Sequence, residues 1–142
     1  MRSIFVLLSS AVLLSCGGPA GSSLAWPSDA SVHVTVTRDD LHPTYRCDGE
    51  VQTRFATATF SCTAEGFDGW DVRGSAEQVV LSDVTRLWIH DADSTSMTGQ
   101  PEIAIDLEPH GDRYLGWATV VLPDGTFAGH PGASAEAWID SP

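Results

Sequence analysis

Residues 55–64, which read FATATFSCTA, carry the pattern that decides the fold. Successive side chains of a β-strand point to opposite faces of a sheet, so a strand with one buried face shows apolar side chains at every second position. The segment therefore predicts a half-buried strand that carries Cys62 into the core. The small or apolar side chains on one face would be Ala56, Ala58, Phe60, Cys62 and Ala64.

The same alternation recurs in SVHVTVTR (31–38), EIAIDLE (102–108) and ASAEAWID (133–140). Turn-forming residues separate the strands, as in Pro-His-Gly-Asp (109–112) and Pro-Asp-Gly (123–125). The first of these turns would join two strands into a hairpin. Short strands separated by such turns predict a mainly β fold, a single antiparallel β-sandwich or barrel.

Residues 75–90, SAEQVVLSDVTRLWIH, fit the β pattern less well. Their apolar side chains lie at near-helical spacing, and Ser75 with Gln78 could form a helix capping box. The β-branched content and the surrounding pattern favour strands. A short helix near residues 75–90 is the alternative.

The first 16 residues, MRSIFVLLSSAVLLSC, have the features of an exported chain. Arg2 precedes an apolar run of signal-peptide length, Ile4–Leu14, which is too short to span a bilayer. Leu-Leu-Ser-Cys at its end resembles the lipobox of bacterial lipoproteins. The resemblance implies cleavage before Cys16, acylation of that cysteine, and attachment to the membrane by lipid chains alone.

The alternative is ordinary secretion, with cleavage after Ala25 and loss of Cys16. This site lies ten residues beyond the apolar run, so it ranks second. In the lipoprotein family an Asp after the acylated Cys retains many members at the inner membrane. Gly17 stands there instead, so the resemblance implies the outer membrane if the envelope has two.

The sequence divides into a signal peptide (1–15), a flexible tether (16–31) rich in Gly, Pro, Ser and Ala, and a single β domain (32–142). Once Cys16 carries lipid, Cys47 and Cys62 remain. Export to an oxidising compartment makes a disulfide between them the expectation. The alternative is two free buried thiols or a metal pair, although the cysteines do not have CxxC spacing.

The chain is acidic, with 19 Asp and Glu, seven Arg and no Lys among 142 residues. Removal of Arg2 with the signal peptide leaves six Arg against 19 acids and a formal net charge of −13. Such a surface repels nucleic acid, so a nucleic-acid partner is not expected. The acidity could serve solubility or cation binding, and charge alone does not separate the two.

Two segments are candidate binding sites. Residues 65–74, EGFDGWDVRG, place Phe67 and Trp70 in a Gly-rich loop, where aromatic rings could contact a carbohydrate or a protein. The alternative is that Trp70 folds back onto the core.

Residues 90–95, HDADST, place Asp91 and Asp93 two positions apart after an expected strand. This spacing resembles the start of a calcium loop, although the rest of that motif is missing and a solvated acidic turn would look the same. Because both segments flank residues 75–89, we expect them at one end of the domain, where loops usually carry function.

Motifs for catalysis are not found in the sequence. It has no G-x-S-x-G, no H-E-x-x-H and no phosphate-binding Gly-rich loop, and no two of its five His stand two or four residues apart. We therefore expect a non-catalytic binding or structural module of the bacterial cell envelope, without a cofactor, whose ligand is a protein or a carbohydrate. The alternative is a small envelope hydrolase or cation-binding protein with a dispersed site.

Overall fold

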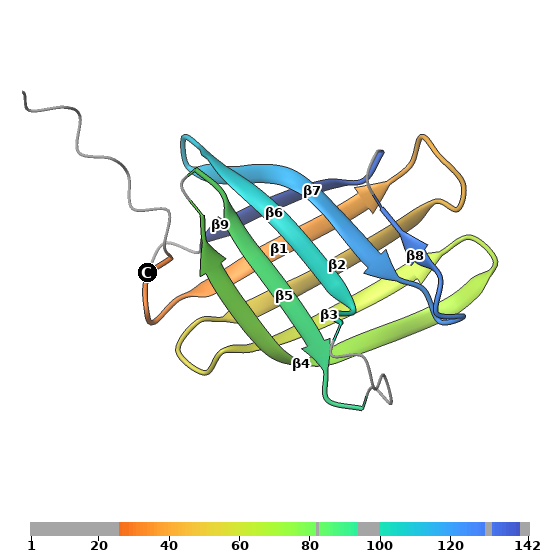
Figure 1. Cartoon of the computed structure of the whole chain (residues 1–142), viewed down its shortest axis with the longest axis horizontal. Coiled ribbons are helices and arrows are strands. Elements are labelled where there is room, and N and C mark those ends of the chain that lie inside the picture. The colour runs from red at the N-terminus through yellow and green to blue at the C-terminus, as the bar shows by residue number, and fades with distance from the viewer. Residues whose placement is uncertain (1–25, 82, 94–99, 130–131, 140–142) are drawn as a thin grey trace, which may run out of the picture.

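The computed structural model describes residues 26–81, 83–93, 100–129 and 132–139, and within these ranges every regular element is a β-strand (Figure 1). The strands are β1 (Ser31–Arg38), β2 (Tyr45–Gln52), β3 (Thr57–Ala64), β4 (Phe67–Val80), β5 (Thr85–Asp91), β6 (Ile103–His110), β7 (Arg113–Val121), β8 (Phe127–Ala128) and β9 (Ser134–Ile139).

The strands form a closed antiparallel barrel. From β1 to β7, each strand pairs with the next one in the sequence, and β9 pairs with both β7 and β1, which closes the ring. The short β8 is the extra strand and pairs with the end of β7, beyond β9. The expected mainly β fold is confirmed, and of the two expected architectures the structure is the barrel.

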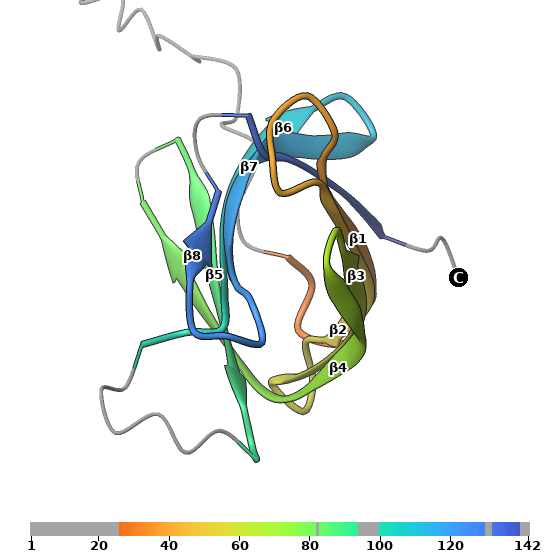
Figure 2. The same ribbon diagram turned by 90° about the vertical axis from the view of Figure 1, so that its right-hand side faces the viewer.

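The barrel is flattened, with β1, β2 and β3 on one side and β5, β7 and β8 on the other (Figure 2). The long β4 passes from one side to the other. It pairs with β3 as far as Ser75 and with β5 from Gly74 onward. A Cβ atom on Gly74 would lie 1.9 Å from the carbonyl oxygen of His90, so the close approach of β5 at this bend requires glycine.

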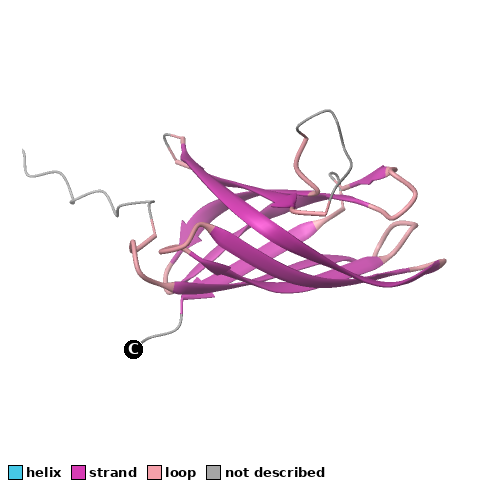
Figure 3. Ribbon diagram, turned by 90° about the horizontal axis from the view of Figure 1, so that it is seen from below, coloured by secondary structure: helices cyan, strands magenta, loops and turns pink. Residues whose placement is uncertain are grey.

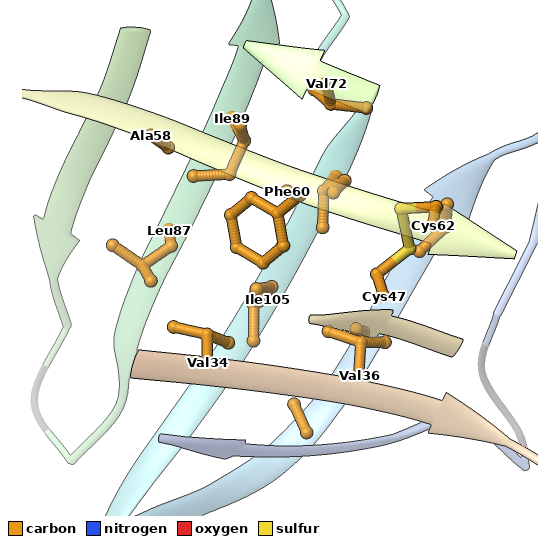
Figure 4. Close-up of a cluster of buried hydrophobic side chains, with 14 of the residues drawn as sticks. Val34, Val36, Cys47, Ala58, Phe60, Cys62, Val72, Leu87, Ile89 and Ile105 are labelled. Atoms are coloured by element: carbon orange, nitrogen blue, oxygen red, sulfur yellow. A yellow bond between two sulfur atoms is a disulfide. The ribbon is translucent and has the colours of Figure 1, made fainter. Parts of the chain in front are cut away.

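The core fills the space between the two sides of the barrel. An eight-stranded barrel has an interior narrow enough to be filled by side chains. Phe60 lies near the middle, among valines of β1 and apolar side chains of β5 and β6 (Figure 4). Its ring covers Gly49, where a Cβ atom would lie 2.3 Å from Phe60 Cδ1.

The expected disulfide between Cys47 and Cys62 is confirmed. The two cysteines are direct partners in the register of β2 and β3, and their Cα atoms are 4.1 Å apart. Both side chains are buried, as the alternation around Cys62 predicts.

The expectation of strands over residues 75–90 is confirmed, and the alternative of a short helix is wrong. The segment is a hairpin of β4 and β5 instead, closed by a hydrogen bond from the Leu81 N–H to the Val84 carbonyl at 2.8 Å. The near-helical spacing arises because two strands of opposite direction contribute apolar residues on either side of the turn. Figure 3 shows strands and loops over the described chain, without a helix.

The segment that precedes β1 is part of the barrel. Trp26 is buried and packs edge-on against Tyr114, with ring centroids 5.7 Å apart. Thr53, in the β2–β3 turn, fixes the segment: its hydroxyl donates to the Pro27 carbonyl (2.7 Å) and accepts from the Ala30 N–H (2.9 Å). Residues 26–30, which the sequence assigns to the tether, thus pack against the barrel. The expected signal peptide and Cys16 lie outside the described residues.

Candidate functional site

The Gly-rich segment 65–74 is mostly strand. Phe67 and Trp70 belong to β4, where Phe67 is paired with Ala64 and Trp70 with Cys62. Both aromatic side chains are half-buried and pack against the core. The proposal that they form an open stacking platform therefore loses its main support, although ligand binding at Phe67 and Trp70 stays an untested prediction.

The acidic segment begins at the end of β5. The Asp91 N–H donates to Glu102 Oε2 (3.2 Å), and the Asp93 N–H donates to Asp91 Oδ1 (3.1 Å). Residues 94–99, which would complete a calcium loop, lie outside the described residues. Within the described ranges, no three His, Cys, Asp or Glu side chains form a group that could hold a metal ion. Metal binding at Asp91 and Asp93 also stays a prediction.

The structure does not bring these two candidates into one cluster. They lie toward the same end of the barrel, but Asp91 pairs with Gly74, four residues along β4 from Trp70. At about 3.3 Å per residue, this offset is about 13 Å. A site that uses both would have to span that distance.

A different surface has the geometry of a binding site. On the outer side of β9, β1, β2 and β3, alternate residues point away from the core and form a polar face, which we call the outer β1 face. From β1 to β3 its side chains are mainly hydroxyl-bearing or charged. Its members are His33, Thr35, Thr37, Arg46, Asp48, Glu50, Thr59, Ser61, Thr63, Ser134, Glu136 and Trp138.

Two hollows in the outer β1 face meet at Trp138 and Thr35. The first groove, of about 430 Å³, extends across β1, β2 and β3 and includes Asp48, Glu50 and Ser61 in its lining. The second groove, of about 540 Å³, extends toward β7 and includes Arg113 and Glu136.

Trp138 is held in a defined orientation. It lies opposite His33 of β1 and Arg113 of β7 in the sheet register. The His33 and Trp138 rings stack with centroids 5.5 Å apart and an angle of 18° between their planes. Because both rings project from paired strands, the aromatic surface between the two grooves is fixed by the barrel itself.

Hydrogen bonds order the polar groups next to this aromatic pair. Asp48 accepts from Thr35 Oγ1 (2.8 Å) and from Arg46 through Nε and Nη2 (2.6 and 2.8 Å). Partial desolvation raises the pKa of Asp48, but the bonds from Arg46 and Thr35 and the charge of Arg46 lower it more, so the pKa lies below its ordinary value. This carboxylate is therefore ionised at neutral pH.

A similar arrangement lies on β3 and β4, next to Asp48. Ser61 Oγ donates to Asp71 at 2.7 Å, and Arg73 donates to the same carboxylate at 2.8 Å. The hydrogen bond from Ser61 is the main cause that holds the pKa of Asp71 below its ordinary value. In the second groove, Arg113 pairs with Glu136. The face therefore presents hydroxyl groups and ionised carboxylates on the β2 side of Trp138, and the Arg113–Glu136 pair on the β7 side.

A third hollow lies at the rim of the barrel where β1 ends, and we call it the rim pocket. It has a volume of about 400 Å³ and shares Thr37 and Arg46 with the second groove. The rest of its lining includes Arg38, Thr44 and Thr63. The three hollows thus follow one another along β1, from His33 to Arg38.

Comparison of the chain with family models, with curated proteins and with solved structures finds no match. In the part of the chain that the structure covers, no helix is long and apolar enough to cross a membrane.

Sequence reasoning missed the outer β1 face. The alternating pattern of the sequence does place His33 and Trp138 on strands, and it places His33 on the side opposite the apolar face of 31–38. The sequence pattern does not predict that β1 pairs with β9, a pairing that joins the two ends of the folded chain. Without that pairing, the two aromatic residues are separate surface positions.

Proposed function

We propose that this chain is a lipid-anchored, non-catalytic binding module of the bacterial cell envelope that holds a glycan along the outer β1 face. The observation that carries the proposal is the Trp138–His33 stack at the junction of the two grooves. A sugar ring has an apolar C–H face and a rim of hydroxyl groups. An aromatic ring can cover that face while hydrogen-bonding groups on either side bind the rim.

The polar groups next to Trp138 suit a ligand rich in hydroxyl groups. Asp48, in the first groove, and Asp71, on β4 beyond that groove, are ionised acceptors held in place by their arginine and hydroxyl partners. A carboxylate held by Arg still has lone pairs for a sugar hydroxyl. The linings of the two grooves together extend over β7, β9, β1, β2 and β3, which favours an extended chain over a compact small molecule.

The same electrostatics favour binding over hydrolysis. Glycoside hydrolysis uses one carboxyl group as a proton donor, with a raised pKa, beside a second carboxylate. The pKa values of Asp48 and Asp71 are instead shifted downward by their donors. A carboxyl group that has lost its proton at neutral pH is a ligand acceptor, not a general acid.

The anchoring part of the proposal rests on the resemblance of Leu13–Cys16 to the lipobox. Trp26, the first described residue, follows Cys16 by ten positions. Ten residues span at most about 35 Å when fully extended. A lipid on Cys16 would therefore keep the barrel close to the membrane surface, with the Trp26 end nearest to it.

The test is a titration of the purified protein with two neutral tetrasaccharides, chitotetraose and cellotetraose, followed by NMR and calorimetry. We expect at least one of them to shift the Trp138 indole signal, and Trp138→Ala to weaken its binding by about tenfold through loss of ring stacking. Trp88→Ala is the matched control, because Trp88 projects outward from β5 and lines none of the three hollows.

Three results would contradict the proposal. One is the absence of any signal change at Trp138 with both sugars. Another is an equal loss of binding in the Trp88 variant. The third is release of shorter oligosaccharides during the titration, which would show catalysis.

A further inference from the structure

Arg38 differs from the other arginines of the folded chain. The remaining five in the described ranges each form an ion pair with a carboxylate: Arg46 with Asp48, Arg54 with Asp29, Arg73 with Asp71, Arg86 with Asp106, and Arg113 with Glu136. Arg38 has no such pair within the described residues. In a chain with 19 acidic residues, an arginine without a carboxylate partner needs an explanation.

The Arg38 side chain is also partly withdrawn from water. Its Nε atom is buried and has no hydrogen-bond partner among the described residues. A buried donor without an acceptor destabilises the fold unless something else satisfies it. Burial raises the pKa of Tyr45, the register partner of Arg38, to about 12, and the charge of Arg38 partly offsets that rise. The positive charge therefore acts at the rim, beside Tyr45.

The rim pocket around Arg38 offers further donors. Thr37, Thr44 and Thr63, whose hydroxyl groups can donate, belong to its lining, as does Arg46, whose guanidinium is paired with Asp48. These are groups that bind the oxygens of an anion.

Two acidic residues, Glu65 and Asp39, also line the pocket. Glu65 is held by His42 Nδ1 at 2.6 Å and by the Thr44 backbone N–H, so its carboxylate is already bound elsewhere. Asp39 is exposed. Neither forms an ion pair with Arg38 in the described structure, which leaves the guanidinium for a ligand.

We propose that the rim pocket binds an oxyanion, a carboxylate, sulfate or phosphate group, with Arg38 as its main ligand. The planar guanidinium matches the two oxygens of such a group and can donate to both at once. The threonine hydroxyls would supply the remaining hydrogen bonds.

The position of the pocket also narrows the class of glycan. It continues the second groove through Thr37 and Arg46, so one ligand can lie on both. From His33 to Arg38 is five residues of β1, or about 17 Å. This inference rests on the proposed function: the geometry assigns an acidic glycan as the ligand, with one ring on Trp138 and an anionic group at Arg38.

The first experiment tests the anion site alone, with inorganic phosphate and acetate titrated separately into the purified protein and followed by NMR. We expect saturable shifts at Thr44 and Tyr45 at millimolar concentrations. Arg38→Gln should abolish them, and Arg38→Lys should retain a weaker response because it keeps the charge without the planar fork. Arg54→Gln is the control, since Arg54 is an exposed, ion-paired arginine near the opposite end.

The second experiment compares tetragalacturonate with the neutral chitotetraose. We expect the acidic sugar to bind at least tenfold more tightly, and Arg38→Gln to remove this advantage while leaving chitotetraose binding unchanged. Thermal unfolding of each variant shows whether it is folded, and should Arg38→Gln not fold, the Lys variant carries the test.

The outcomes separate the two proposals. If tetrasaccharide binding depends on Trp138 but neither anions nor tetragalacturonate respond to substitution of Arg38, the oxyanion site is refuted and the glycan groove stands. If phosphate or acetate binds through Arg38 but no sugar binds, the oxyanion site stands and the glycan groove is refuted. A response to phosphate alone, or to acetate alone, identifies the anionic group.

Discussion

Replacement of Gly49 by alanine tests whether the interior is filled as the structure shows. A Cβ atom added at Gly49 would lie 2.3 Å from Phe60 Cδ1, 2.4 Å from Phe60 Cγ and 2.6 Å from the Thr59 carbonyl oxygen. These distances are far inside van der Waals contact, and Phe60 is fully buried, so its ring has little room to move. Overpacking of this kind typically costs about 1–3 kcal/mol. For a domain of about 110 residues, we expect a fall in melting temperature of about 5–15 °C.

A matched glycine provides the control. Gly69 also lies in a strand, but an added Cβ atom there would meet only ordinary contacts, 3.5 Å from the Cys62 carbonyl oxygen and 3.8 Å from Thr63 Cγ2. Gly69→Ala should therefore leave the free energy of unfolding within about 0.5 kcal/mol of the native value. Differential scanning calorimetry of both variants makes the comparison.

A double-mutant cycle identifies the contact responsible. Phe60→Ala alone should cost about 3–5 kcal/mol, because it leaves a cavity in the core. In the Gly49→Ala, Phe60→Ala double variant, the new methyl group no longer meets the ring. The loss of unfolding free energy in the double variant should therefore be smaller, by about 1 kcal/mol or more, than the sum of the losses in the two single variants. Additive costs, or a Gly49→Ala variant as stable as the native protein, would refute the packing around Phe60.

Two further predictions concern the cysteines. Reduction of the disulfide between Cys47 and Cys62, which are 15 residues apart, should lower the free energy of unfolding by about 3 kcal/mol in urea titrations, and equal stability of the two forms would contradict its structural role. Cys16→Ser should abolish lipid attachment and shift the protein out of the membrane fraction. Mass spectrometry of the native protein decides the point, because an unmodified N-terminus at Trp26 would indicate ordinary secretion instead.

The sequence predicts the strands well because each buried face has a period of two. In 57–64 and 103–107, the alternation identifies the buried side chains Phe60, Cys62, Ile105 and Leu107. The same reasoning places the disulfide inside, since Cys62 shares the face of Phe60. Local turn residues locate the β6–β7 hairpin, although the turn is shorter than expected and Pro109 and His110 belong to β6.

Closure of the sheet is not encoded in any local pattern. A sandwich and a barrel have the same alternation along each strand, and they differ in whether β9 pairs with β1 as well as β7. The bend of β4 at Gly74 depends on the approach of the His90 carbonyl from another strand. The sequence pattern also assigns Phe67 and Trp70 to a loop, because the pairing of β4 with other strands is not visible in it. In the structure, β4 includes both residues and continues toward the bend.

The arrangement of the two ends bears on how an anchored barrel would present its grooves. The segment from Trp26 to Ala30 is fixed to the β2–β3 turn by Thr53, so a tether from Cys16 reaches the barrel at this end. Arg38 lies at the other end of β1, eight residues and about 26 Å away. The rim pocket would then face away from the bilayer, while Trp138, paired with His33 near the start of β1, lies closer to it. An acidic glycan bound along β1 would therefore have its anionic group at the outer end of the barrel, away from the negative charge of membrane lipids.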